Sequence, residues 1–192
     1  MKAIGWLAGA VMALGAHAAC AQAQERFYFG ASAGSSNMDN SVTEGLITSG
    51  TVDGKDSGTK IYGGYRFGRN FALELAYVDL GAAGYSGDFL GTPVAGGKVK
   101  VSGFNSSLVG HIPATVNLEL FVKAGLYTWE AKASDVTGGV PFSDKTNGNN
   151  LSLGVGANYF FTKNVGARIE WEHFELDPGS AGLFSAGVIV KF

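Results

Sequence analysis

Charged side chains recur at every second position in several segments of this 192-residue chain, with apolar residues between them. In the segment 59–80, Lys60 and Arg66 precede a short turn and Glu74 follows it. Opposite charges that are buried together persist as ion pairs. We therefore predict one interior ion-pair network. Most of its members lie in segments where charged and apolar residues alternate. Its members are Lys60, Arg66, Glu74, Glu119, Lys123, Arg168, Glu170, Glu172 and Lys191, with Glu74, Lys123, Arg168 and Glu170 at the centre.

Two histidines are the candidates for acid–base chemistry. A lipid-modifying enzyme needs a nucleophile and a base close together. His173 is expected near one rim of the structure. The lipid A deacylase pattern places a serine two positions after its histidine, but that position here is Glu175, and no serine is paired with His173 locally. His111 is expected near the opposite rim, facing inward. We predict no catalytic residues, no cofactor and no metal site.

The segment 59–80 carries the clearest structural pattern. Two alternating stretches flank the three-residue turn 68–70, which indicates a β-hairpin. Ile61 and Leu73 fall on apolar faces, whereas Lys60 and Glu74 fall on the opposite faces. Each strand therefore has one apolar face and one charged face.

The same alternation predicts eight strands. They are expected at 27–34, 59–67, 71–80, 98–112, 118–129, 151–161, 165–172 and 182–192. The connections alternate between long (35–57, 81–97, 131–150 and 176–181) and short (68–70, 113–117 and 162–164). Short turns at one end and long loops at the other are typical of outer-membrane barrels. The predicted fold class is all-β: an eight-stranded antiparallel up-and-down transmembrane β-barrel, closed by its first and last strands.

The charged faces are expected to point inward. A Lys or Arg on the lipid face near mid-bilayer costs about 2–4 kcal/mol. Eight strands enclose a space that side chains can just fill, so a wide pore is not expected. The alternative is a soluble barrel such as a lipocalin, in which the apolar faces would point into water.

Aromatic residues are expected at both membrane interfaces. Phe27, Phe67, Phe71, Phe161 and Phe192 are predicted at the short-turn end, and Tyr77 and Trp171 towards the other end. Lys98 and Lys100 do not fit the inward parity of their strand. They either lie above the membrane plane, near the phosphates of lipopolysaccharide, or follow a bulge near Gly103 that shifts the register.

The N-terminus resembles a secretory signal peptide, which divides the chain into residues 1–23 and a barrel domain at 24–192. Lys2 precedes an apolar stretch at 3–15, and cleavage is expected after Ala23. The alternative is a lipoprotein signal acylated at Cys20, although His17 replaces the usual leucine. With a net charge of −2, the chain shows no nucleic-acid footprint.

Residues 60–80, 154–159 and 168–172 resemble the OmpA-like transmembrane domain and its relatives among outer-membrane β-barrels. The resemblance implies an outer-membrane location and an interior plug in which Glu74, Lys123, Arg168 and Glu170 match the family's paired residues. The C-terminus is similar to the signal read by the barrel-assembly machinery. That signal would comprise Val188, Val190 and Phe192, although Val190 replaces a common tyrosine.

Several functions are compatible with this architecture. The first is a structural or surface-interaction protein for adhesion or envelope integrity, with loops such as 35–57 contacting a host or matrix ligand; such loops could equally be passive. The second is a narrow ion channel, and the third is a lipid A-modifying enzyme. The expected partners are outer-membrane lipid, lipopolysaccharide and the barrel-assembly machinery, and no nucleic acid.

Overall fold

The computed structural model describes residues 26–38, 49–53, 55–89, 92–137, 140–177 and 179–192. The predicted signal peptide and residues 39–48 of the predicted loop 35–57 lie outside these ranges. None of the residues that the structure describes belongs to a helix long and apolar enough to cross a membrane.

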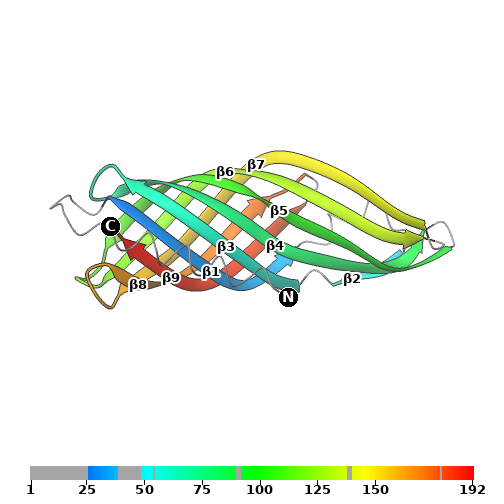
Figure 1. Ribbon diagram of the computed structural model, residues 1–192, viewed down its shortest axis with the longest axis horizontal. Helices are drawn as coiled ribbons and strands as arrows, with labels where there is room; N and C mark the ends of the chain where they lie inside the picture. The colour runs from blue at the N-terminus through cyan, green and yellow to red at the C-terminus, as the bar shows by residue number, and fades with distance from the viewer. Residues whose placement is uncertain (1–25, 39–48, 54, 90–91, 138–139, 178) are drawn as a thin grey trace, which may run out of the picture.

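The described residues form strands that wind around one axis (Figure 1). They are β1 (Phe27–Met38), β2 (Ser49–Asp53), β3 (Lys55–Arg66), β4 (Phe71–Phe89), β5 (Thr92–Pro113), β6 (Leu118–Thr137), β7 (Val140–Phe160), β8 (Val165–Glu175) and β9 (Ser180–Lys191). All neighbouring pairs are antiparallel, and the sheet order β2-β4-β3-β1-β9-β8-β7-β6-β5 closes through an additional β4–β5 pairing.

Strand β2 continues β3 rather than adding a ninth position to the barrel. β3 pairs with β4 up to Asp79, and β2 pairs with the same edge of β4 further along, from Gly84 to Asp88. The prediction of a closed eight-stranded antiparallel barrel is therefore confirmed. The closing strands are β1 and β9, paired from Tyr28–Lys191 to Met38–Ala181.

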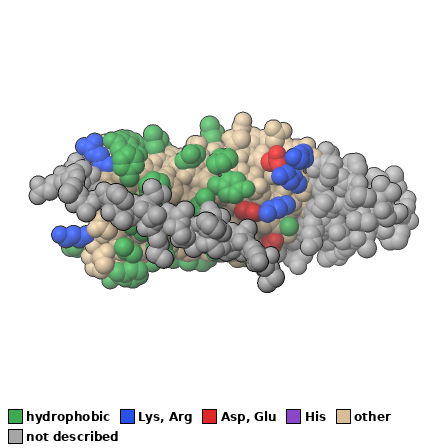
Figure 2. Space-filling view, in the orientation of Figure 1, with side chains coloured by type: hydrophobic (Ala, Val, Ile, Leu, Met, Phe, Trp, Pro, Cys, Tyr) green, Lys and Arg blue, Asp and Glu red, His purple; other side chains and the backbone are tan. Residues whose placement is uncertain are grey.

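Side chains alternate between the lumen and the outer surface as predicted. On β4, Leu73 and Leu75 are more than half exposed, whereas Ala72, Glu74 and Ala76 between and beside them are buried. The outward residues of the other strands follow the same rule near the short-turn end, which produces the band of hydrophobic side chains visible in Figure 2. Such a band is what lipid contact requires.

Three of the predicted long loops are wrong in extent. In the segment 35–57, residues 35–38 belong to β1, 49–53 form β2 and 55–57 belong to β3. The segment 81–97 is largely strand, because β4 and β5 continue to Phe89 and from Thr92, and 131–150 belongs to β6 and β7 apart from 138–139, which lie outside the described residues. These hairpins extend past the ends of β1, β8 and β9 (Figure 1). The physical reason is that backbone pairing continues beyond the lipid, where side chains need not alternate between apolar and polar.

The alternative interpretation, a bulge near Gly103, is met only in part: the β4–β5 pairing shifts register opposite Ser102 and Lys100, but Lys100 still points outward. β5 stays in register with β6 through Gly103–Trp129, and the irregularities occur on the other edge of β5, between Asp79 and Ala82 and between Tyr85 and Gly87. Lys100 is exposed on the outer surface, as the first of the two interpretations requires. The side chain of Lys98 lies outside the described part of the chain.

The seam between β1 and β9 requires a residue without a side chain at position 187. A Cβ there would lie 2.0 Å from the carbonyl oxygen of Ala31 and 2.5 Å from Cα of Ser32. Gly182 on the same strand is the matched control, because its nearest neighbour would be Trp171 Nε1 at 3.8 Å.

We predict that Gly187→Ala destabilises the barrel by about 1–3 kcal/mol, because the seam must separate to admit the methyl group. Gly182→Ala should leave stability unchanged. Denaturant unfolding of the refolded protein in detergent, followed by tryptophan fluorescence, measures both. Equal midpoints for the two variants would contradict the close approach at the seam.

Candidate functional site

The centre of the lumen is filled by a cluster of six ionic side chains, here called the central network. Its members are Lys60 from β3, Glu74 from β4, Lys123 from β6, and Arg168, Glu170 and Glu172 from β8. Each is at most 4% exposed. Three cations face three carboxylates, so the network carries no net charge.

Lys123 lies among all three carboxylates. Its Nζ is 3.3 Å from Glu74 Oε1 and 2.6 Å from Glu170 Oε1, and it also contacts Glu172. Lys60 pairs with the same two β8 carboxylates, with Nζ 2.5 Å from Glu172 Oε2. The two lysines thus hold neighbouring glutamates of one strand that would otherwise repel each other.

Arg168 completes the network through Glu74 and Glu170. Its Nη1 donates to Glu74 Oε2 at 2.8 Å, and its guanidinium lies over the rings of Tyr62 and Phe121, with centroids at 4.4 and 4.1 Å. The Tyr28 hydroxyl donates to the same Glu74 oxygen at 2.9 Å. A guanidinium stacked on aromatic faces is weakly hydrated and suits a buried ion pair.

A second ionic cluster lies nearer the short turns. Arg66 forms a fork with both carboxylate oxygens of Glu119, at 2.9 and 2.5 Å, and His111 Nδ1 is 2.9 Å from Glu119 Oε1. Asn158 donates to the same oxygen at 3.1 Å, and Lys191 Nζ lies 3.8 Å from Oε2. The structure therefore divides the nine predicted residues into six in the central network and three around Glu119, and joins His111 to the latter.

Apolar side chains fill the lumen on the outer side of the central network. Continuing outward along their strands, Tyr127 follows Lys123 on β6 and Phe174 follows Glu172 on β8, and their ring centroids are 4.6 Å apart. Leu80 and Leu183 are buried beside them. The lumen is thus closed twice, by ion pairs in the middle and by this apolar layer beyond them.

The alternation of inward and outward side chains along each strand does not by itself identify the polar residues that complete the network. The hydroxyl of Ser152 donates to Asn105 Oδ1 at 2.7 Å and that of Ser107 donates to the same oxygen at 3.2 Å, while Asn105 lies within 3.5 Å of Glu172. Their inward parity was a usable signal, but short uncharged side chains on a strand do not reveal which partner they meet.

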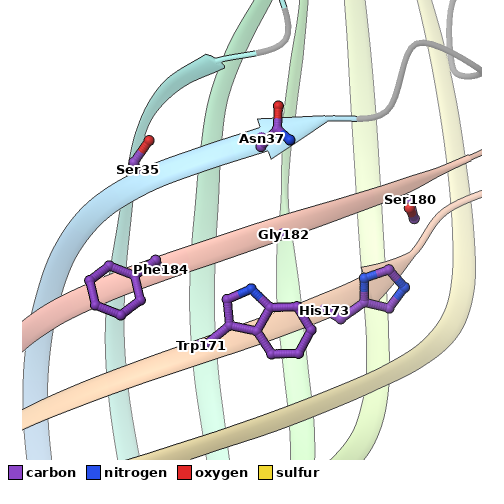
Figure 3. A pocket seen from close by; sticks show the side chains of 7 residues that line it. All are labelled: Ser35, Asn37, Trp171, His173, Ser180, Gly182 and Phe184. Carbon is purple, nitrogen blue, oxygen red and sulfur yellow. The ribbon is translucent and has the colours of Figure 1, made fainter.

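A groove with a volume of about 360 Å³ crosses β1, β9 and β8 on the outer surface (Figure 3). It is lined by Ser35, Asn37, Trp171, His173, Ser180, Gly182 and Phe184. His173 stacks on Trp171 with ring centroids 6.1 Å apart. That contact suits an aromatic residue at a membrane interface. No cluster of His, Cys, Asp or Glu suited to a metal ion occurs within the described ranges.

The predicted assembly signal lies on the closing seam. Val188 is exposed on the outer face of β9, and Phe192 exchanges backbone hydrogen bonds with Phe27 at 2.8 and 3.3 Å. Its ring also meets Phe29 edge-on, with centroids 6.0 Å apart. Recognition of this end by the assembly machinery stays a prediction.

Residues 6–192 match the model of the outer membrane protein beta-barrel domain family. The chain belongs to this family. Membership places the protein in the bacterial outer membrane, as predicted from the alternating pattern. No curated protein sequence matches the chain.

Solved structures share the fold. The Neisserial surface protein A (NspA) aligns with a TM-score of 0.61 at 20% identity, over 86% of this chain and 97% of NspA. Ail, the attachment invasion locus protein of Yersinia pestis, aligns with a TM-score of 0.59 at 16% identity, over 88% and 100%. OprG from Pseudomonas aeruginosa aligns with a TM-score of 0.57 at 12% identity, over 90% and 99%.

We predict that Lys123→Met destabilises the barrel by about 3–5 kcal/mol, because three carboxylates would then share two buried cations. Adding Glu172→Gln should restore part of the loss by removing the excess negative charge. Lys163→Met, in the exposed turn between β7 and β8, is the control and should change little. Denaturant unfolding in detergent micelles gives all three values, and an unaltered midpoint for Lys123→Met would show that the network does not stabilise the fold.

Proposed function

We propose that this protein is a closed outer-membrane scaffold that does not conduct, and whose outer hairpins make contacts at the cell surface in adhesion or envelope integrity. The observation that carries the proposal is the double closure of the lumen. A path for solutes would have to pass both the neutral central network and the apolar layer of Tyr127 and Phe174. The outer hairpins are therefore the part of the molecule that is available for contacts with other molecules at the cell surface.

The outer hairpins support this assignment. Tyr77 is one of the aromatic residues expected at the outer membrane interface. From Tyr77 to its last residue, Phe89, β4 extends about 40 Å along the strand. β5, β6 and β7 extend in the same direction (Figure 1). Paired strands present side chains in a fixed order, which suits recognition better than an unordered loop.

The names of two relatives point the same way but belong to those proteins. NspA is a surface protein, and Ail is an attachment invasion locus protein that was also solved with the heparin analogue sucrose octasulfate. The likeness of these proteins to this chain is limited to the fold. A host or matrix ligand for this chain is therefore part of the proposal. His173 receives no catalytic role in it.

Shortening the β6–β7 hairpin tests the proposal. Lys132 and Lys145 are directly paired, so replacing 133–144 with Asn-Gly keeps the register and closes the hairpin with a tight turn. We predict at least a severalfold loss of binding to epithelial cells or matrix by bacteria that carry the variant. Binding equal to that of the wild type would count against this hairpin.

The control for that experiment is assembly. The shortened variant should reach the outer membrane in the same amount and show the same difference in gel mobility between heated and unheated samples, because the membrane-spanning residues are unchanged. An insertion of the same two residues into the turn 162–164 at the opposite end should leave binding intact.

A narrow ion channel is the second candidate. The observation that favours it is that ion pairs, rather than packed apolar side chains, close the middle of the lumen, and charged partners can exchange. We predict no conductance above baseline in planar bilayers for the wild type or for Glu74→Ala, because the apolar layer persists in both. Step currents that rise or vanish in Glu74→Ala would support the channel instead.

A further inference from the structure

The groove across β1, β9 and β8 is centred on the missing side chain of Gly182. On the outer faces of these strands Asn37, Gly182 and His173 form one row, because Gly182 pairs directly with both of the others. A Cβ at Gly182 would have Trp171 Nε1 at 3.8 Å and the carbonyl oxygen of Glu172 at 3.9 Å as its nearest neighbours. The floor of the groove is therefore open backbone, with side chains standing on either side of it.

Aromatic rings form one wall of the groove. Phe184 and Trp171 pair directly, one row nearer the membrane than Gly182, and their side chains are 58% and 47% exposed. The ring of His173 stacks on that of Trp171, with an angle of 23° between the two planes. Figure 3 shows the indole and the imidazole side by side along β8, next to Gly182. They offer a ligand two adjoining ring surfaces.

Polar groups line the rest of the groove. The amide of Asn37 both donates and accepts hydrogen bonds, Ser35 and Ser180 carry hydroxyls, and the indole N–H of Trp171 lies beside the floor. Among the residues that the structure describes, the lining contains no Lys, Arg, Asp or Glu. Glu175 pairs with Ser180 at the upper end, where its carboxylate would repel an anion. The groove therefore suits an uncharged ligand that has both hydroxyl groups and apolar surface.

The upper end of the groove reaches past the lipid headgroups. Trp171 is one of the aromatic residues expected at the outer membrane interface. From Trp171 to Glu175, β8 rises about 13 Å, or about 10 Å along the barrel axis at the usual tilt. The polar headgroups extend roughly 5–8 Å beyond the hydrocarbon of each leaflet. A ligand can thus enter the groove from the water above the membrane.

We propose that this groove binds an uncharged sugar ring at the end of a glycan that approaches from outside the cell. A pyranose ring has a face of C–H groups, which packs on aromatic rings, and a rim of hydroxyls, which donate and accept hydrogen bonds. Trp171 and His173 supply the ring surfaces, and Asn37 supplies a donor and an acceptor across the notch. The volume of about 360 Å³ lies at the lower end of the range for ligand sites, about 300–1,000 Å³, and fits one or two such rings.

The lining favours a neutral sugar over the other molecules that reach this surface. An acyl chain would cover Asn37 and Ser35 without replacing the hydrogen bonds that these side chains make to water. The phosphorylated sugars of a neighbouring glycolipid would meet no ammonium or guanidinium group among the described lining residues. A neutral glycan satisfies the polar groups and leaves no charge unpaired.

The site is independent of the contacts proposed for the outer hairpins. All its lining residues belong to β1, β8 and β9, whereas those hairpins are built from β4 to β7. The shortened β6–β7 variant retains the whole groove, so adhesion through the hairpin and sugar binding can be lost separately.

Saturation-transfer NMR of the refolded protein, in a detergent without a sugar headgroup, tests the proposal. The probes are maltotriose, lactose, mannotriose and chitotriose, four neutral glycans that end in different sugars. Sorbitol, a polyol without a ring, is the control ligand. We expect at least one glycan to bind with a dissociation constant of about 1–10 mM, because one or two rings contact the protein. Added salt should leave the affinity unchanged, since no ion pair forms, and sorbitol should not bind.

Filling the notch gives the matched pair of variants. Gly182→Leu should lower the affinity about tenfold while the barrel folds as before, because the added side chain enters open space. Ala186→Leu adds the same bulk to the outer face of the same strand, two rows nearer the middle of the membrane and outside the groove, and should bind as the wild type does. Trp171→Phe should keep part of the affinity that Trp171→Ala loses, because the ring surface remains. The difference in gel mobility between heated and unheated samples checks folding.

Four results would overturn the proposal. One is that the wild type binds none of the four glycans, which does not depend on any variant. A second is that sorbitol binds as well as the glycans do. A third is that Gly182→Leu binds as the wild type does, or that Ala186→Leu loses as much. The last is binding of a glycolipid in detergent that the free glycans do not compete, which would make the occupant a neighbouring lipid.

Discussion

Hydrocarbon cannot hydrogen-bond to a peptide group, and this constraint determines the architecture. An amide left unpaired in lipid costs several kcal/mol, so a sheet that crosses the bilayer must have no open edge. The first strand pairs along its length with both β3 and β9, and β4 closes the circle through β5. Closure then divides every strand into a lipid face and a lumen face, and the distribution of all other residues follows from that division.

The lumen face could in principle have been apolar, as in a soluble core. In this protein it holds six ionic side chains with no net charge, and the Tyr28 hydroxyl and the Asn105 amide donate to two of their carboxylates. Replacing such a network by apolar residues often costs nothing in stability, whereas removing one partner costs much. The network is thus better explained by specificity: each residue has only a few partners that can neutralise it, and only one register brings them together.

The sequence predicted what depends on alternation and little of what depends on distance. Lys60, Glu74 and Arg168 could be assigned to the lumen because their neighbours are apolar and because a charge in lipid is costly. Their partners could not be assigned, because strand tilt brings together residues more than a hundred positions apart, such as Lys60 and Glu172. The outer hairpins were underestimated for a related reason: past Leu80 no lipid requires apolar side chains, so the pattern ended before the strands did.

Alternation has a further consequence for how such a chain reaches its membrane. A segment with charged residues at alternate positions, such as β8 with Arg168, Glu170 and Glu172 in succession, never presents the run of about 20 apolar residues that makes a spanning helix. A strand such as β8 is thus too polar to remain in a bilayer alone, and becomes compatible with lipid only when its charges are enclosed by the other strands. The central network therefore links two properties of one sequence: it keeps the separate segments that carry it out of a membrane, and it is neutralised only in the closed barrel.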